Sequence, residues 1–452
     1  MAPAAGYRRQ ASMQRPWRAH GLSLWRGRMP LQGGGWRRTF AALGVRNYRL
    51  FWSGQVVSLV GTWAQLTGQS WLVAKTLAQP PLVLGTVTML QFLPVLLFSL
   101  PAGVVADRVN KRGLLIATQT AAMLQALALG LLVVTGRVQL WHVCLLAFLL
   151  GLINSFDNPV RQAFISEMVG QDLLVNAVAL HSIIFNLARI VGPMVAGVSI
   201  ALVGTGSTFL INAASFVPVL AGLLLMRARE LYASPRASEG SLWERLREGI
   251  SYSLGSPPTF RVLLLMAFIG TFGYNFLVVL PLLARDVLKV ESVGFGGMTS
   301  VMGVGSILAA LFLAYRRRAE ESQLFLGAAA FSLLLVLLGL SPWLGASLVL
   351  LVAMGFAGVT FTATGNTRLQ LLSPPELRGR VLSLYVLLFA GSTPIGGQLL
   401  GLAAQHLGVQ AAVALFGLVC LLGVGLALLY RRLAPGPAPA PETTDVSGGP
   451  LI

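Results

Sequence analysis

The stretch from Gly103 to Arg112 reads GVVADRVNKR and separates two long apolar segments that carry no charged residue. Inside a bilayer a chain must close its backbone hydrogen bonds within helices or closed barrels, and charged side chains there are costly. A charged cluster between two such segments therefore marks the point where one membrane helix ends and the next begins. This stretch predicts a helical membrane protein.

The composition of the whole chain agrees with this interpretation. Charged residues make up 11% of the 452 residues and hydrophobic residues 55%, whereas soluble domains contain about 25% charged residues. The formal net charge of +18 is typical of nucleic-acid binding, but the basic residues are not interleaved with aromatic residues and lie between the apolar segments. We therefore expect contact with membrane lipid and no nucleic-acid partner.

Sequence motifs of enzymes and of metal or nucleotide sites are missing. The two cysteines, Cys144 and Cys420, each lie within an apolar run, which indicates neither a disulfide framework nor a metal cluster. The sequence has no GxxxxGK[ST] loop and no HExxH helix, and its four histidines offer no Ser-His-Asp set. We expect no enzyme activity, no cofactor and no bound metal.

Apolar segments long enough to span a bilayer, which takes about 20 residues, recur along the chain. They predict an all-α membrane protein with twelve transmembrane helices in two pseudo-symmetric six-helix halves. The predicted helices lie near residues 49–75, 83–106, 113–135, 139–162, 174–203, 207–227, 260–288, 294–315, 322–341, 344–371, 380–404 and 408–430.

A weak internal repeat favours this division into halves. The fourth predicted helix ends in NSFDNPVRQ and the tenth in TATGNTRLQ, which place an Asn and an Arg at nearly corresponding positions. Two duplicated halves that face one cavity are what alternating access requires. The predicted regions are a basic tail at 1–48, a first half at 49–227, a linker at 228–259, a second half at 260–432 and a disordered tail at 433–452.

The linker and the first tail have distinctive patterns. A capping box at Ser241 and Glu244 precedes leucine and isoleucine residues that recur every four positions, so we expect an amphipathic helix. It lies either on the inner membrane surface or simply between the halves. Residues 1–48 contain nine Arg and no acid, which fits a tail attracted to anionic lipid, an extension outside the fold or a mitochondrial presequence.

The distribution of the 33 Lys and Arg residues predicts the orientation. Basic residues concentrate in cytoplasmic segments of membrane proteins. With both termini in the cytoplasm, the predicted outer loops hold only Lys75, Arg137, Arg285 and Lys289. We therefore expect a protein of the bacterial cytoplasmic membrane with both termini inside.

Polar side chains recur on single faces of the predicted helices, for example at Ser58, Thr62, Gln65 and Gln69. Lipid penalises such faces, so they should face protein or water. They either form hydrogen bonds between helices or line a substrate cavity. The candidate cavity residues are Gln65, Gln69, Asn154, Asn186, Arg189, Tyr274, Asn275 and Thr364.

Charged residues inside the predicted helices form a second candidate set. An Arg at a helix centre costs about 2.5–3.5 kcal/mol, so Arg189 needs a partner or a ligand. It either binds an anionic substrate or ties helices together. Asp157 could reach Arg189 through a cavity, but its depth favours a pair with Arg161 or with the loop at 103–112, and we expect it to stabilise a gate at the inner face.

The opening stretch resembles the signature between the second and third helices of transporters of the major facilitator superfamily. Gly103, Asp107, Arg108, Lys111 and Arg112 match the signature, whereas Asn110 replaces its second Gly. Asn tolerates a positive φ, so we expect the tight turn to be kept. The resemblance implies that this stretch is a gate loop.

The resemblance extends from Asn47 to Arg431 and narrows to the exporter branch that contains enterobactin exporters and macrolide efflux proteins. The matching stretches include SGQVVSLVGTW, DNPVRQAFISEMV, REGISYSLGSPPTFR and PPELRGRVLSLY. The stretch RIVGPMVAG, with Gly192, Pro193 and Gly197, is similar to the Gly-Pro motif of antiporters and implies a helix-packing role.

A closing contact between the halves can also be predicted from position. Asp107 ends the second predicted helix, and Arg378 and Arg380 precede or begin the eleventh. The positive N-terminal end of that helix should attract the carboxylate when the halves close.

The sequence thus predicts a secondary active transporter that exports small amphiphilic molecules, such as a siderophore or a macrolide-like drug. Protons are the candidate coupling ion, the partners are a small-molecule substrate and lipid, and the expected form is a monomer. Uptake by the same fold and a non-transporting membrane sensor or scaffold are the alternatives.

Overall fold

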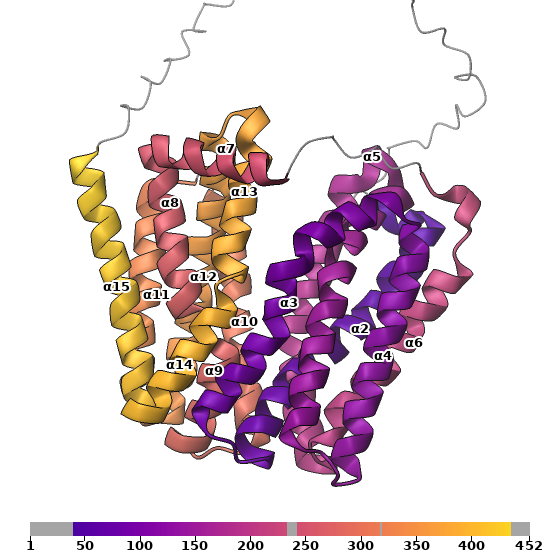
Figure 1. The fold of residues 1–452 in the computed structure, drawn as a ribbon, viewed down its shortest axis with the longest axis horizontal. Helices are drawn as coiled ribbons and strands as arrows, with labels where there is room; N and C mark the ends of the chain where they lie inside the picture. The colour runs from indigo at the N-terminus through magenta and orange to yellow at the C-terminus, as the bar shows by residue number, and fades with distance from the viewer. Residues whose placement is uncertain (1–38, 233–241, 317–318, 435–452) are drawn as a thin grey trace, which may run out of the picture.

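The computed structural model describes residues 39–232, 242–316 and 319–434, and within these ranges the chain is helical and contains no β-strand (Figure 1). This confirms the all-α class. The long helices form two groups that stand side by side. The first group consists of α2 (Arg46–Trp71), α3 (Pro81–Arg108), α4 (Lys111–Val134), α5 (Leu140–Val203) and α6 (Gly206–Leu225).

The second group follows the helix α7 (Leu242–Gly255). It consists of α8 (Pro257–Phe268), α9 (Phe276–Leu282), α10 (Ser292–Arg316), α11 (Glu321–Leu340), α12 (Leu344–Leu372), α13 (Pro375–Ala390), α14 (Thr393–Leu407) and α15 (Val409–Leu433). Short helical turns complete the described chain at η1 (Ala41–Gly44), η2 (Leu72–Thr76), η3 (Ala228–Glu230), η4 (Ile269–Gly273) and η5 (Leu283–Val287).

Ten helical runs in the described part of the chain are long and apolar enough to cross a membrane. One of them, α5, has 64 residues and is broken at Gly170, where φ is 71° and ψ is −178°. The 26-residue α2 is not among the ten, because its many polar residues lower its hydropathy. Twelve spans follow if α5 counts as two and α2 is added, so the number twelve stays a prediction.

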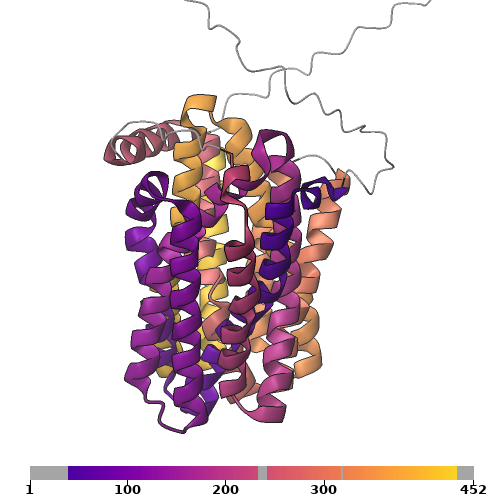
Figure 2. The same cartoon turned by 90° about the vertical axis from the view of Figure 1, so that its right-hand side faces the viewer.

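The helix α7 lies across the ends of the spans at one face of the molecule (Figures 1 and 2). We call this the linker face, and the opposite face, which carries the turns at 72–80 and 283–291, the hairpin face. Glu248 of α7 forms an ion pair with Arg380 of α13. The Tyr252 hydroxyl donates to the carbonyl of Leu372 at 2.7 Å. These contacts hold α7 against the second group.

The two groups meet along a seam formed by α3 with α14 and by α5 with α10. Glycines allow the backbones to approach closely there. A Cβ on Gly85 would lie 2.6 Å from the carbonyl oxygen of Gly397, and one on Gly197 would lie 2.6 Å from that of Ser292. The seam therefore has little room for side chains. Within the first group, Gly192 of α5 packs equally closely against α2, since a Cβ there would clash with Trp63.

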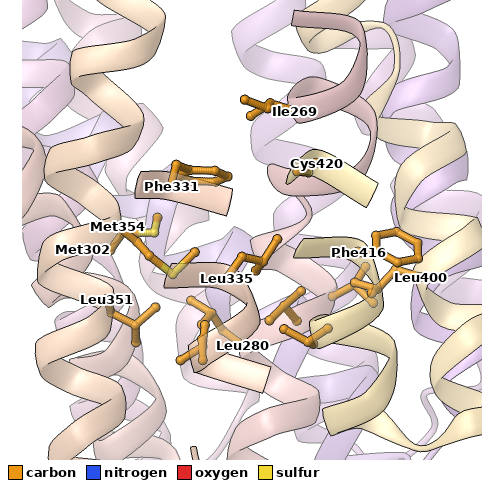
Figure 3. Packing of buried hydrophobic residues seen from close by; sticks show 14 of the residues in the cluster. Ile269, Leu280, Met302, Phe331, Leu335, Leu351, Met354, Leu400, Phe416 and Cys420 are labelled. Carbon is orange, nitrogen blue, oxygen red and sulfur yellow. The ribbon is translucent and has the colours of Figure 1, made fainter. Parts of the chain in front are cut away.

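Buried hydrophobic residues form one large cluster that fills the second group and extends into the first, and two smaller clusters within the first group. Figure 3 shows part of the large cluster, where Leu280, Leu335 and Phe416 come together from three different helices. This packing fixes the broken span that contains α8 and α9, and that span carries part of the site described next.

Candidate functional site: a polar cavity and an aromatic pocket

A cavity of about 850 Å³ lies within the first group of helices and is lined by residues of α2 to α6. Its polar lining includes Gln65, Asn154 and Asn186, three of the candidate cavity residues. Trp63 and Phe185 contribute an aromatic wall, with ring centroids 5.7 Å apart. Polar and apolar side chains thus share one space that can hold an amphiphilic molecule of drug size.

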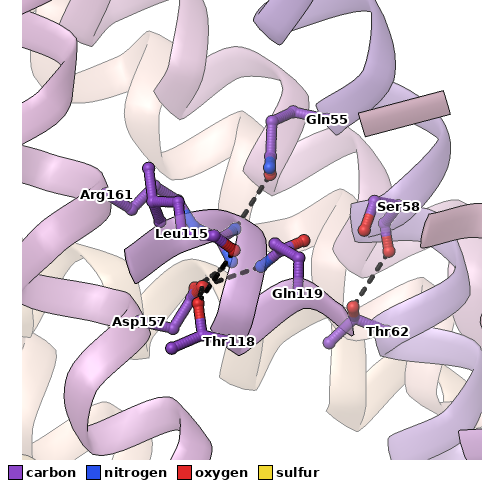
Figure 4. A network of polar contacts seen from close by, with 8 residues as sticks. All are labelled: Gln55, Ser58, Thr62, Leu115, Thr118, Gln119, Asp157 and Arg161. Atoms are coloured by element: carbon purple, nitrogen blue, oxygen red, sulfur yellow. Dashed lines mark hydrogen bonds and ion pairs between the residues drawn. The ribbon is translucent and has the colours of Figure 1, made fainter. Parts of the chain in front are cut away.

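Asp157 is the one acid among the described residues that line this cavity, and Figure 4 shows the polar contacts around it. Its side chain is only 1% exposed. The carboxylate accepts hydrogen bonds from the Thr118 hydroxyl at 2.7 Å and from Gln119 Nε2 at 2.8 Å. Its second oxygen forms an ion pair with Arg161, one turn later on the same helix. In this structure the partner of Asp157 is therefore Arg161 and not the loop at 103–112.

Three polar atoms of this network have no hydrogen-bond partner within the described residues: Gln55 Nε2, Gln119 Oε1 and Arg161 Nε. Arg161 uses its other nitrogens, because Nη1 donates to Gln55 Oε1 at 2.8 Å and Nη2 faces Asp157. Buried polar atoms without partners are costly. Two of the three residues, Gln119 and Arg161, line the cavity. The wall therefore offers one hydrogen-bond acceptor and one donor to a polar ligand.

A second polar network in the cavity wall is a chain of hydrogen-bonded side-chain amides that includes Gln65 and Asn212. Asn212 Nδ2 donates to Gln65 Oε1 at 2.7 Å, and Gln65 Nε2 donates to Gln125 Oε1 at 2.9 Å. Gln125 in turn donates to the carbonyl of Leu146 at 3.1 Å. Each amide is thereby fixed in orientation, so Gln65 serves both as cavity lining and as a bond between helices.

A smaller pocket of about 140 Å³ lies where Arg189 of α5 reaches the second group. Its wall contains Tyr274, Phe331 and Phe389. The Tyr274 and Phe331 rings stack with centroids 4.9 Å apart, and Tyr274 meets Phe389 edge-on at 4.7 Å. The structure thus brings Arg189 and Tyr274 together at one site, which is separate from the residues that line the larger cavity.

Three candidate cavity residues line neither space. Gln69 is buried and donates to Gln91 Oε1 at 2.7 Å. Asn275 is buried and donates to the carbonyl of Thr271 at 2.7 Å. Thr364 is buried in α12, and its hydroxyl has no partner in the described part of the chain. In this structure these residues lie within the helix packing and not in the cavity walls.

The predicted gate loop is only partly described, because the side chains of Asp107 and Arg108 lie outside the described residues. Lys111 forms an ion pair with Glu167 at 2.8 Å. Arg112 donates to the carbonyls of Leu223 and Leu224 at 2.8 and 3.0 Å. Gly103 lies within α3 with no heavy atom near its absent Cβ. The gate role of the loop stays a prediction.

Asn110 does not adopt the positive φ that its Gly counterpart in the signature suggested. Its φ is −64° and its ψ is 107°, and its side chain accepts a hydrogen bond from the Gly113 amide at 3.0 Å. Asn110 is therefore the N-cap of α4. Asn is a favoured N-cap residue because its side-chain oxygen satisfies a free amide of the first helical turn.

The remaining predicted residues occupy helix contacts. Arg378 is exposed, and Arg380 pairs with Glu248 in this structure. Pro193 and Gly197 lie on the seam with α10, where a Cβ on Gly296 would lie 2.5 Å from the Pro193 carbonyl oxygen. The capping box that includes Ser241 lies outside the described residues. No group of three or more potential metal ligands occurs within the described ranges.

Sequence reasoning missed Gln55, Thr118, Gln119 and Gln125, although all four contribute to the two polar networks. A signal was present in the sequence, because Gln119 and Gln125 interrupt an otherwise apolar predicted helix at 113–135. Intramembrane polar residues of this kind rarely face lipid.

The hydrogen bonds and the ion pair described between the two groups lie toward the hairpin face. Arg285 Nη1 donates to the carbonyls of Ala74 and Gln79, each at 2.7 Å. Lys75 and Glu291 form an ion pair at 3.5 Å. Trp71 stacks on Phe295 with centroids 5.2 Å apart. These contacts close the hairpin face.

The sequence is similar to those of known transporters and exporters. The model of a family described as transmembrane secretion effector matches residues 37–447. The staphyloferrin A transporter of Staphylococcus aureus is 24% identical over 82% of this chain and 92% of its own length. Macrolide efflux protein A of Streptococcus pyogenes is 24% identical over 82% of this chain and 93% of its own. The enterobactin exporter EntS of Shigella flexneri is 26% identical over 76% of this chain and 82% of its own length.

A solved structure supplies the comparison of folds. A bacterial homologue of the human lysosomal transporter Spinster, in an inward-facing and unoccupied conformation, matches with a TM-score of 0.68. The two sequences are 14% identical, and the match covers 90% of this chain and all of that one. This likeness shows the fold.

Proposed function

Because the chain belongs to the transmembrane secretion effector family of the major facilitator superfamily, and is therefore a membrane transporter and not an enzyme, we propose that it exports small amphiphilic molecules in exchange for protons. The resemblance to enterobactin exporters and macrolide efflux proteins is confirmed. The observation that carries the proposal is the cavity of about 850 Å³, in which amide and aromatic side chains surround one carboxylate, that of Asp157.

In this proposal the two groups of helices are the two halves of an alternating-access transporter in a bacterial cytoplasmic membrane. The linker face is the cytoplasmic face, since Arg227, Arg229, Arg316, Arg431 and Arg432 lie at helix ends there. The large apolar surface of the bundle faces lipid, and the protein acts as a monomer.

The seam supports a state in which the cavity opens to the cytoplasm. Contacts between the groups gather toward the hairpin face, as at Arg285 and Trp71. The cavity lining extends in the other direction to Ser166 and Leu174, on either side of the break at Gly170. A molecule in the cytoplasm would enter by this route.

Size and lining support a broad substrate class. The volume lies within the range of about 300–1,000 Å³ that is usual for sites of small organic ligands. Among the described lining residues Asp157 is the only acid, and it is already paired. Amide groups with aromatic neighbours suit neutral or weakly anionic amphiphiles, the class to which relatives named for macrolides and siderophores point.

Asp157 is the residue proposed to carry the coupling proton. Protonation of its Oδ2 neutralises the carboxylate and removes the countercharge of Arg161. The Arg161 guanidinium then turns into the cavity and takes up the space in which substrate binds. Loss of the proton restores the ion pair and clears the cavity wall, where Gln119 Oε1 and Arg161 Nε lack partners and can bind substrate. Proton and substrate thereby exclude one another, which is the requirement for exchange.

Transport into inverted membrane vesicles tests the proposal. We expect vesicles that contain the protein to accumulate a macrolide or a catechol siderophore when the vesicle interior is acidic, and to stop when a protonophore removes the gradient. Asp157→Asn should reduce gradient-driven accumulation at least tenfold while substrate exchange without a gradient persists. Asp172→Asn, at an exposed position of the same helix, is the matched control and should transport normally.

The alternatives predict other results. Accumulation only in right-side-out vesicles, or a rise in cellular drug content on expression, would establish uptake. No transport of any panel compound by well-folded protein would favour a sensor or scaffold. Unchanged coupling in Asp157→Asn would remove Asp157 from the mechanism.

A further inference from the structure

The span formed by α8, η4 and α9 is interrupted in its middle. The π-helical turn η4 follows α8, and Tyr274 and Asn275 then leave helical geometry with ψ values of 35° and 37°. Interrupted membrane helices often form ligand sites, because the interruption turns side chains and backbone groups toward a cavity. Here it places Tyr274 in the wall of the pocket of about 140 Å³.

The pocket wall consists largely of aromatic rings and methionine thioethers. Tyr274, Phe331 and Phe389 supply ring faces and edges, and Met302 and Met354 complete the wall from α10 and α12. Figure 3 shows Phe331, Met302 and Met354 close together in the buried cluster. Aromatic rings and thioethers both favour contact with another aromatic ring. The volume is close to the cavity of about 150 Å³ that is known to admit benzene when it is lined by apolar side chains.

One cation reaches this wall from the other group of helices. Arg189 of α5 lines the pocket and has neither an ion pair nor a hydrogen bond within the described residues; its guanidinium lies 5.8 Å from the centroid of the Trp63 ring. The hydroxyls of Ser306 and Thr362 are bonded to carbonyls of their own helices, each at 3.0 Å. An Arg held within a span without an anion is unfavourable.

We infer that this pocket, which we call the ring pocket, binds one aromatic ring that carries a carboxylate, with the ring against Tyr274, Phe331 and Phe389 and the anion on Arg189. The inference rests on the proposed function and gives it a substrate class, that of aromatic acids or larger molecules with such an end. Because Arg189 belongs to the first group and the rings to the second, the bound ligand joins the two groups.

Gly358 supplies an independent geometric test. It lies in the pocket wall, and a Cβ there would lie 2.5 Å from the Tyr274 hydroxyl and 3.2 Å from the Phe331 ring. Gly358→Ala therefore narrows the ring pocket without a change of charge. Gly425→Ala is the matched control, because no heavy atom lies within 4 Å of the Cβ position there.

Binding of radiolabelled benzoate to the full chain in lipid nanodiscs tests the inference, with protein-free nanodiscs as background. Loss of a hydrogen-bonded ion pair should weaken binding about tenfold or more, so Arg189→Gln should show at least this loss. Arg189→Lys should keep part of the affinity, and Arg137→Gln, at an exposed position, should keep all of it. Benzyl alcohol should compete poorly with wild-type protein, since it has the ring without the anion. Gly358→Ala should weaken benzoate binding several-fold.

The outcomes separate this inference from the proposed function. Equal benzoate affinity in wild type and Arg189→Gln, or no specific binding to folded wild-type protein, overturns the ring pocket, while vesicle transport of neutral macrolides leaves export intact. Absence of all vesicle transport with specific, Arg189-dependent benzoate binding overturns export and keeps the ring pocket as a binding site. Benzyl alcohol competing as well as benzoate overturns the role of the anion.

Discussion

Asp157 is a carboxylate inside a predicted span, and its side chain is only 1% exposed. Removing a carboxylate from water costs several kcal/mol unless hydrogen bonds and a counterion replace the water. Thr118, Gln119 and Arg161 provide these contacts. The carboxylate is thereby stabilised in a wall that still adjoins the cavity.

We expect the Asp157 and Arg161 substitutions to be non-additive. Breaking a buried pair by removing one partner costs about 3–5 kcal/mol, because the other charge is left unpaired. Arg161→Gln should therefore lower the thermal midpoint in detergent strongly, and Asp157→Asn should also lower it. The double variant should be more stable than Arg161→Gln alone. Additive losses would show that the pair has no special coupling.

At the scale of the helices, Gly170 is the residue that divides the 64-residue α5 into two spans. It separates the two spans of α5, and its φ of 71° lies in the left-handed region. The ring of Tyr232 lies 3.2 Å from the position of its absent Cβ. A short reversal at this point brings the two spans together at the linker-face end of the cavity, since Ser166 and Leu174 both line it.

Gly170→Ala should destabilise the protein by about 1–3 kcal/mol, because a φ of 71° with a ψ of −178° is a backbone conformation that essentially only Gly adopts. Contact with Tyr232 should add to this loss. Thermal unfolding monitored by circular dichroism measures the effect. Gly297→Ala is the control, because that position is helical and open, and it should keep or slightly raise the midpoint, since Ala is favoured over Gly within a helix. A midpoint that is not lowered in Gly170→Ala would contradict the strain argument.

The elements were more predictable from the sequence than their contacts. Apolar length predicted the helical class, and the predicted span at 113–135 lies close to α4 at Lys111–Val134. Periodicity identified the face that holds Gln65 but not its partners, Gln125 and Asn212, since spacing along one helix does not indicate which other helix it meets. For the same reason Asn275 was placed in the cavity, whereas it bonds to the Thr271 carbonyl.

At the scale of the whole molecule, closure at the hairpin face depends on a few polar contacts and a seam of glycines. Arg285 joins two carbonyls of the other group, and Lys75 pairs with Glu291. Exposed ion pairs contribute little to stability, so closeness of the backbones and exclusion of water matter more. Opening of this face therefore requires the Trp71–Phe295 stack and the close glycine contacts to part.

A reversible cross-link at the hairpin face should stop transport. Lys75→Cys with Glu291→Cys, after Cys144 and Cys420 are replaced by Ala, should be joined by a short cleavable bismaleimide. Vesicle transport should fall to background on cross-linking and return on cleavage, because the hairpin face must open in each cycle. The single-cysteine variants control for modification alone. Full transport by the cross-linked protein would show that this face need not open.

Under the proposed exchange, Asp157, the single acid among the described lining residues of the cavity, also sets the electrical work of the cycle. One proton that returns per molecule exported moves a single positive charge inward, which is worth about 2.3 kcal/mol per 100 mV of membrane potential. For a neutral substrate this supports a gradient of roughly 50-fold per 100 mV, and for a monoanion, whose exit moves a second charge, roughly 2,000-fold. A cation would gain nothing from the voltage and would depend on the pH difference alone. A wall with one acid thus makes voltage a force that discriminates among substrates by their charge.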